Sequence, residues 1–385
     1  MASPPAKVRR HLVALYRVVR LRKKWSRGSR SATHAMLDRL ARVAGESVAF
    51  ILLFLIAASV ASAQQSAPAP AQSSAGGASA PAIARPAVGK LRVLVVPAFW
   101  SDYAGAEPAS VARITELMNM VRAYYLEASY GKLELVLTVT PWIRLSVPNP
   151  GGCPNVPAVK AVLASPAIAS YLAAGLDRIV VFQPRVAEQC FPHGIAAGPS
   201  AWINGVFDEK VIGHELGHTL GLGHAHQLNC GAEAALVVRA CRVVVTGDFY
   251  ALMGKWNMGH LIAMHKAQLG WITPVTHAGG VAEYDLTPIA AKDGALYAVK
   301  VVRGARTFWI ERREPSGFDA KIPGPGIVIH VVDGSIGCGE SCILNMSANG
   351  DDFLSGAPLQ VGQKWSDSGM TIEVVRAGRI RVTTR

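Results

Sequence analysis

The sequence predicts an α+β fold, in which a body of strands and long helices precedes a small all-β, sandwich-like domain. Half of the 385 residues are hydrophobic, so the chain can bury at least one sizeable core. Two stretches before residue 225 carry apolar residues at the 3.6-residue spacing of amphipathic helices. After Trp271 the pattern changes to short apolar runs separated by Gly, Pro and Asp. We therefore expect the body at residues 90–275 and the β-rich domain at 276–385.

Four strands and three helical stretches are expected in the body. The strands are Leu91–Pro97, Leu133–Val139, Arg178–Phe182 and, as an edge strand, Trp202–Phe207. Ser110–Tyr130 predicts a long amphipathic helix that ends near Gly131. Pro154–Ala174 is Ala-rich and predicts a helix in pieces, and Glu209–Leu220 predicts an amphipathic helix that stops at Gly221.

Short strands dominate the last 110 residues. They are expected at Leu296–Val302, Arg306–Arg312, Gly326–Val332, Thr371–Arg376 and Arg379–Thr384. The tight turn Ala377-Gly378 joins the last two strands into a hairpin.

The N-terminal region has the pattern of an export signal. Residues 1–46 contain 12 basic and two acidic side chains, and Val48–Ala58 is an uncharged apolar run. Small residues follow at Ala61 and Ala63, which completes a secretory signal peptide cleaved after Ala63. A membrane anchor is the alternative, but a spanning helix needs about 20 apolar residues. We expect a secreted or periplasmic protein.

The positive charge of the chain is concentrated in this leader. The formal net charge is +13, but everything from Gln64 onward has 27 basic and 24 acidic side chains, a net of +3. We therefore expect no nucleic-acid partner. Once the leader, residues 1–63, is cleaved off, we also expect no stable insertion into a membrane. Met36 opens a better proportioned leader and is a second candidate start. Residues 64–89 predict an extended Ala/Pro/Ser-rich linker.

Six cysteines remain in the exported part. An even count in an exported chain favours disulfides. Fifteen pairings of these six are possible and the sequence does not choose among them, although proximity suggests Cys230 with Cys241 and Cys338 with Cys342.

Residues 214–224 read HELGHTLGLGH and predict a catalytic zinc site. On a helix His214 and His218 lie at i and i+4, so both imidazoles project from one face and can share one ion. Gly221 can adopt the left-handed conformation that ends the helix, and His224 then returns as a third ligand. Three histidines leave the fourth tetrahedral position open for water, and Glu215 beside them can act as the general base.

This pattern resembles that of the metzincin zinc endopeptidases, which have a methionine in a tight turn beneath the metal. Met253 in Ala251–Gly254 fits that turn. The segments GDFYALMG and HLIAMHKAQLGW resemble the gametolysin family (peptidase M11) and related bacterial secreted M6/M11-like peptidases. The resemblance covers about residues 90–385 and is specific in 213–271. It implies a twisted mixed sheet with long helices, including the zinc helix, and a peptide laid antiparallel against the edge strand.

Several neighbouring residues leave alternatives open. Tyr250 either stabilises an oxyanion or packs beside Met253, and packing is favoured. His226 is a competing third ligand, but the spacing favours His224. His260 and His265 favour structural roles. Asp351-Asp352 resemble calcium ligands, but two acids in such a loop are usually a solvated turn, so calcium is not supported.

We expect a secreted zinc-dependent metalloendopeptidase with one catalytic Zn²⁺, acting on protein or peptide substrates through a zinc-bound water that Glu215 activates. One alternative is an exported adhesion or carbohydrate-binding protein in which the zinc site is only a scaffold. A zinc amidase that acts on cell-wall peptides is another. The sequence leaves the cleavage preference and the oligomeric state open.

Overall fold

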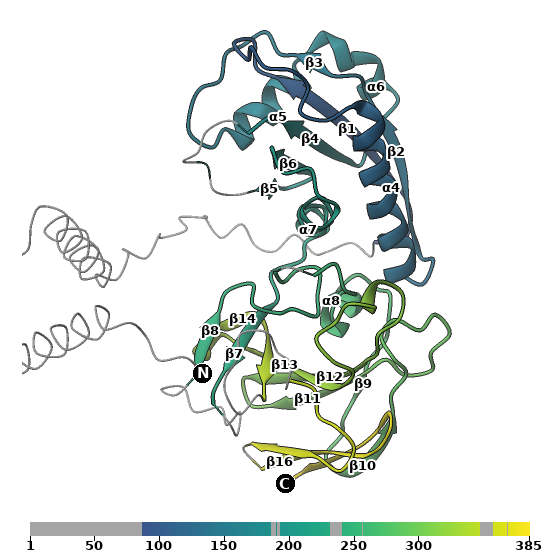
Figure 1. Ribbon diagram of the computed structural model, residues 1–385. Coiled ribbons are helices and arrows are strands. Elements are labelled where there is room, and N and C mark those ends of the chain that lie inside the picture. The colour runs from purple at the N-terminus through teal and green to yellow at the C-terminus, as the bar shows by residue number, and fades with distance from the viewer. Residues whose placement is uncertain are drawn as a thin grey trace, which may run out of the picture. The chain divides into compact units, whose positions relative to one another are not determined.

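Three β-sheets and five α-helices appear in the computed structural model, which describes residues 87–185, 190, 193–231, 241–255, 257–346, 357–367 and 369–385 (Figure 1). The predicted leader, nearly all of the linker and Asp351-Asp352 lie outside these residues. Among the described helices, no single one is long and apolar enough to cross a membrane. One bent pair of helices has the length and composition that a membrane span needs. The mixture of helices and strands agrees with the predicted α+β class.

A six-stranded sheet forms the first part of the described chain. Its strands are β1 (Gly89–Phe99), β2 (Leu133–Val139), β3 (Ile143–Arg144), β4 (Arg178–Gln183), β5 (Gly194–Ala197) and β6 (Ser200–Asn204). The order is β2-β1-β4-β6-β5, and β3 extends the pairing of β1. All pairs are parallel except β5 with β6, which is antiparallel.

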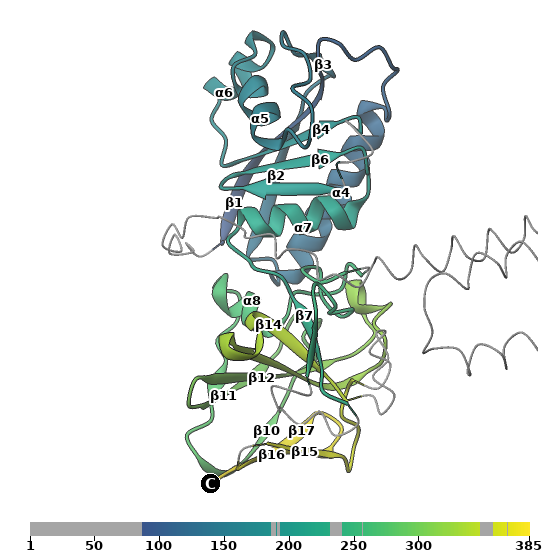
Figure 2. The same cartoon turned by 90° about the vertical axis from the view of Figure 1, so that its left-hand side faces the viewer.

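Helices cover both faces of this sheet (Figure 2). On one face lie α4 (Val111–Ala128) and α7 (Glu209–Thr219), and on the other lie α5 (Asn155–Leu163) and α6 (Ala169–Ala173). Strand residues alternate between the two cores: Val93 and Val95 face α4, whereas Leu94 and Val96 face α5. Helix α7 therefore packs on the sheet face that carries Val93 and Val95.

The β-rich part contains two further sheets that share one hydrophobic core. The seven-stranded sheet has the order β8-β7-β14-β13-β12-β11-β9, and the antiparallel four-stranded sheet has the order β10-β17-β16-β15. The bounds are β7 (His226–Asn229), β8 (Arg242–Val244), β9 (Val275–Thr276), β10 (Gly280–Asp285), β11 (Ala298–Arg303), β12 (Arg306–Arg313), β13 (Gly326–Asp333), β14 (Cys338–Asn345), β15 (Lys364–Asp367), β16 (Met370–Arg376) and β17 (Arg379–Thr384).

The seven-stranded sheet draws strands from both sides of the predicted boundary at residue 275. Strand β7 directly follows the third histidine, and it pairs in parallel with β14, more than 100 residues later. The short helix α8 (Ala263–Gln268) lies between the two parts of the sequence. The division at 275 stays a prediction, but hydrogen bonds connect the two sides of it.

One strand prediction is wrong. Trp202 was expected on an edge strand, but it lies in β6, which is interior because β4 pairs with one side of it and β5 with the other. Its indole is fully buried and donates to Gln183 Oε1 at 2.8 Å. The edge is occupied by β5, whose sequence GIAA has one β-branched residue, Ile195, beside a glycine and two alanines that rarely indicate a strand.

Three disulfides are present among the described residues. Cys230–Cys241 and Cys338–Cys342 confirm the two predicted pairs, and Cys153–Cys190 is the third. Because disulfides persist in oxidising compartments, this set indicates an oxidising environment outside the cytosol.

Candidate metal centre

The helix α7 carries the first two histidines. Asp208 caps its start by accepting hydrogen bonds from the backbone N–H groups of Lys210 and Val211, at 2.9 and 3.2 Å. At the other end Gly221 has a φ of 90°, and Leu222 N–H donates back to Gly217 O. This is the glycine-dependent turn that reverses a chain after a helix. It returns His224 toward the face that carries His214 and His218.

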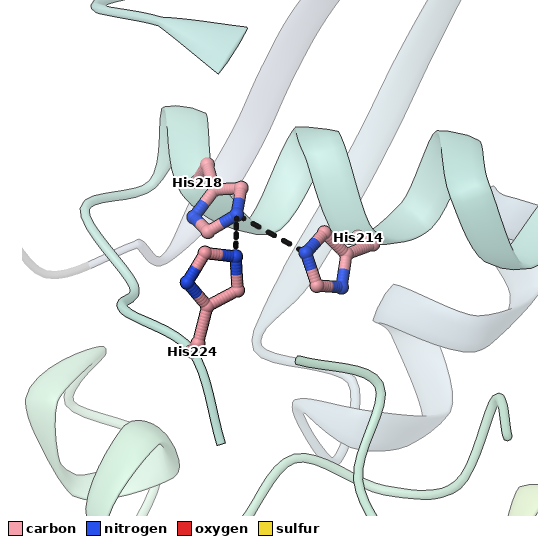
Figure 3. A group of neighbouring side chains, drawn as sticks. All are labelled: His214, His218 and His224. Carbon is pink, nitrogen blue, oxygen red and sulfur yellow. Dashed lines mark hydrogen bonds between the residues drawn. The ribbon is translucent and has the colours of Figure 1, made fainter. Parts of the chain in front are cut away.

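The three histidine rings converge on one point (Figure 3). Nε2 of His218 lies 3.1 Å from Nε2 of His214 and 3.2 Å from Nε2 of His224. The three ligand atoms all lie within 4.8 Å of one another. Two nitrogens bound at about 2.1 Å to a tetrahedral zinc stand about 3.4 Å apart, so the observed spacing is close to that of a zinc site.

The Nδ1 atoms of His214 and His218 fix the tautomers of these two rings. Nδ1 of His214 donates to Leu252 O at 2.9 Å, and Nδ1 of His218 donates to Leu222 O at 2.8 Å. Their Nε2 atoms are therefore free acceptors that point at the shared centre. Burial, reinforced by the His218 ring, lowers the pKa of His214 to about 3, and burial also lowers the pKa of His218. Both rings are neutral at pH 7, which is the form that binds metal.

Glu215 lines a cleft next to the histidines. The cleft has a volume of about 400 Å³, and its other walls include His214, Lys210 and Gly194 of the edge strand β5. A Cβ atom at position 194 would lie 2.5 Å from Cγ of Glu215, so β5 passes directly over this side chain because it has a glycine there. Burial raises the pKa of Glu215 to about 7, a value suited to taking and returning a proton near neutral pH.

Met253 lies in the turn Ala251–Gly254, directly against the zinc helix. Its sulfur would be 2.5 Å from a Cβ atom at Gly217, so the two segments touch only because that residue is glycine. The turn also accepts two hydrogen bonds: Leu252 O from His214 Nδ1, and Met253 O from the Ala225 N–H at 2.9 Å. The turn thus supports both the helix and the loop that carries the third histidine.

Tyr125 and Tyr124 of α4 were not singled out from the sequence, yet they hold this assembly together. The Tyr125 hydroxyl donates to Gly213 O of the zinc helix at 2.8 Å, and the Tyr124 hydroxyl donates to Gly259 O at 2.9 Å. Both rings are fully buried. Hence the long helix, the zinc helix and the loop after the methionine turn are joined through two phenols.

Other histidines and Tyr250 have partners of their own. The Tyr250 ring is buried and its hydroxyl donates to Gly324 O at 2.8 Å, which favours the packing role. His226 Nδ1 accepts from the Thr246 N–H at 3.0 Å. His260 lies 3.0 Å from both Glu127 Oε1 and Lys266 Nζ, and His265 is fully buried. In the described residues only His214, His218 and His224 form a group that could hold a metal ion.

Glu340 is a further residue near the site that sequence reasoning missed. It lies on β14, 116 residues after His224, and its Oε2 accepts from the His224 backbone N–H at 2.8 Å. The same oxygen lies 3.4 Å from Nδ1 of His224 and 3.2 Å from Nε2 of His226. No sequence spacing rule connects His224 with a residue as distant as Glu340. The one local signal was the position of Glu340 between Cys338 and Cys342.

No protein-family model and no curated protein match this chain. Solved structures similar to it include one described as a chaperone–substrate complex, with 16% identity and a TM-score of 0.32, over 46% of this chain and 30% of that one. Wild-type OgpA from Akkermansia muciniphila has 14% identity and a TM-score of 0.30, over 59% of this chain and 72% of that one. Catalytic inactive OgpA in complex with an O-glycopeptide substrate has 13% identity, a TM-score of 0.30, and covers 59% and 71%. Similarity at this level carries no conclusion about function.

Proposed function

We propose that this chain is a secreted zinc-dependent endopeptidase, with His214, His218 and His224 as the zinc ligands and Glu215 as the general base. The convergence of three imidazole nitrogens supports this most strongly, because their spacing fits one tetrahedral ion. A purely structural zinc site has four protein ligands, whereas this group has three among the described residues and adjoins a cleft. The methionine turn beneath the helix agrees with the resemblance to metzincins of the gametolysin type.

Zinc held by these three histidines would supply Lewis-acid chemistry for the hydrolysis of a peptide bond. Glu215 takes the proton of the attacking water and delivers it to the amine as the C–N bond breaks. Strand β5 lies over Glu215 and ends the sheet among the described strands, so we place the substrate peptide along β5. This replaces the earlier expectation of an edge at Trp202–Phe207.

The test is Glu215→Ala, with zinc content and cleavage of a mixed peptide library measured together. Because Glu215 is not a ligand, zinc should stay bound while the cleavage rate falls about 10²–10⁴-fold. Equal activity in the variant would rule out the general-base role.

The same library distinguishes the alternative functions. Cleavage restricted to cell-wall peptides would indicate the zinc amidase. Stoichiometric zinc without any hydrolysis would favour the scaffold in an adhesion protein.

A further inference from the structure

The third histidine is held by a segment from the far end of the sequence. The disulfide Cys338–Cys342 encloses three residues at the start of β14, among them Glu340 and Ser341. Glu340 accepts from the His224 N–H at 2.8 Å, and the Ser341 hydroxyl donates to His224 O at 3.3 Å. Strand pairing of β14 with β7 continues the attachment from His226 onward. Both polar backbone groups of His224 are thus satisfied by this segment.

The carboxylate of Glu340 is itself held from two sides. Nδ1 of His226 accepts a hydrogen bond from the Thr246 N–H, so the proton of that ring is on Nε2. That nitrogen lies 3.2 Å from Glu340 Oε2 and donates to it. On the other side Nδ1 of His224 lies 3.4 Å from the same oxygen. A proton on this Nδ1 leaves the His224 Nε2 lone pair directed at the metal centre.

Gly223 makes this approach possible. A Cβ atom at position 223 would lie 2.9 Å from both Cδ and Oε1 of Glu340, which is too close for either to stay in place. The carboxylate therefore lies against the backbone of the residue before His224. Gly223 has no positive φ, so the need for glycine here is the space that Glu340 occupies.

A carboxylate on Nδ1 distinguishes His224 from the other two ligands. His214 and His218 donate to neutral backbone carbonyls, whereas His224 faces an anion. A carboxylate in this position orients a ligating imidazole and makes its other nitrogen a stronger metal ligand. A ligand outside regular secondary structure gains most from such support, because fixing its ring otherwise costs conformational entropy.

We infer that Glu340 is a positioning residue of the metal centre, which holds the His224 ring in its ligating orientation and strengthens its bond to zinc. This inference rests on the proposed zinc site and adds that the site is complete only with residues of β14. It also gives His226 a role, because His226 holds Glu340 and does not itself ligate.

The experiment measures zinc dissociation constants by chelator competition for the wild type, Glu340→Ala and Glu340→Gln. Removal of such a supporting carboxylate weakens metal binding about 10–100-fold, so Glu340→Ala should fall in this range. Glu340→Gln keeps the acceptor for the His224 N–H but loses the charge, so its loss should be smaller. Thermal unfolding of the metal-free variants checks the fold, which should hold because the Glu340 side chain is 47% exposed.

A pair of glycine variants tests the same contact without changing Glu340. Gly223→Ala should displace the carboxylate and weaken zinc binding in the same direction as Glu340→Ala. Gly339→Ala is the matched control, because the nearest atom to its new Cβ lies at 3.8 Å. In the cobalt-substituted protein, the visible absorption should change in Gly223→Ala and Glu340→Ala and stay unchanged in Gly339→Ala.

Each outcome decides between two claims. Wild-type and Glu340→Ala proteins that bind zinc equally would overturn the positioning role and leave the zinc site standing. A wild-type protein that binds no zinc would overturn both. Lower stability of metal-free Glu340→Ala with unchanged zinc affinity would show that Glu340 serves only the fold.

Discussion

The zinc helix and the loop that follows it deliver histidines to the same point in different ways. On α7, His214 and His218 are placed by helical periodicity, and their Nδ1 atoms donate to backbone carbonyls within 38 residues. The His224 loop has no regular structure of its own, and Glu340 supports it from 116 residues away. The helix arm is thus a product of local sequence, whereas the loop arm depends on the finished β-sheet.

This difference has an energetic meaning. A helix holds two ligands in position before any metal binds, so the conformational entropy of fixing these side chains is already lost on folding. A loop ligand reaches the same state only if other residues fix it. We therefore expect changes in the two arms to affect metal binding and folding in different proportions.

The largest effect is expected from removing a ligand of the helix arm. His218→Ala eliminates one of three nitrogens, about a third of a binding free energy of about 10–16 kcal/mol, or roughly 10²–10⁴-fold in zinc affinity. Isothermal titration with zinc measures this loss. His193→Ala, which removes an exposed histidine from the same cleft, is the control and should bind zinc as the wild type does. Comparable losses in both variants would contradict the ligand assignment.

A smaller effect, on folding and not on the ligands, is expected inside the zinc helix. In Gly217→Ala the new Cβ meets Met253 Sδ at 2.5 Å in a fully buried environment, which should lower the free energy of unfolding by about 1–3 kcal/mol. Gly213→Ala in the same helix meets its nearest atom at 3.4 Å and should be neutral or stabilising by up to about 1 kcal/mol. Urea denaturation of the metal-free proteins compares the free energies of unfolding of the two variants. Equal values would show that the methionine turn can shift to make room for the new Cβ.

The smallest effect is expected from loosening the loop arm indirectly. Replacing Cys338 and Cys342 by serine frees the segment that presents Glu340 but leaves every ligand in place. Zinc affinity should fall a few-fold, below the about 10–100-fold expected for complete loss of the carboxylate. The matched control replaces Cys230 and Cys241, a second disulfide next to strands of the same sheet that does not enclose Glu340. An equal loss in both double variants would mean that general loosening of the sheet, and not Glu340, is responsible.

Much of the helix arm could be predicted from sequence because its determinants are local. The spacing of His214 and His218, the glycine at 221 and the apolar pattern of α4 each depend on neighbours within a few turns. The predicted helix Glu209–Leu220 differs from α7 by one residue. Two of the disulfides were found for the same reason, since their cysteines are close in sequence.

What the sequence did not reveal depends on long-range packing. Strand β5 has the composition GIAA, and its glycine is there to pass over Glu215, a contact that no local pattern signals. Trp202 was expected on an edge strand, but pairing with β5 makes its strand interior. Glu340 has no recognisable spacing to any ligand, and only the docking of β14 beside β7 brings it to the site.

The sequence separation between His224 and Glu340 also has a meaning in time. A ribosome that has just added His224 must add 116 further residues before Glu340 exists. During that interval α7 can place His214 and His218. The third histidine, His224, still lacks the Glu340 carboxylate and the strand β14 that pairs with β7. A chain that ends before Glu340 therefore carries all three histidines without the carboxylate that accepts from the His224 N–H.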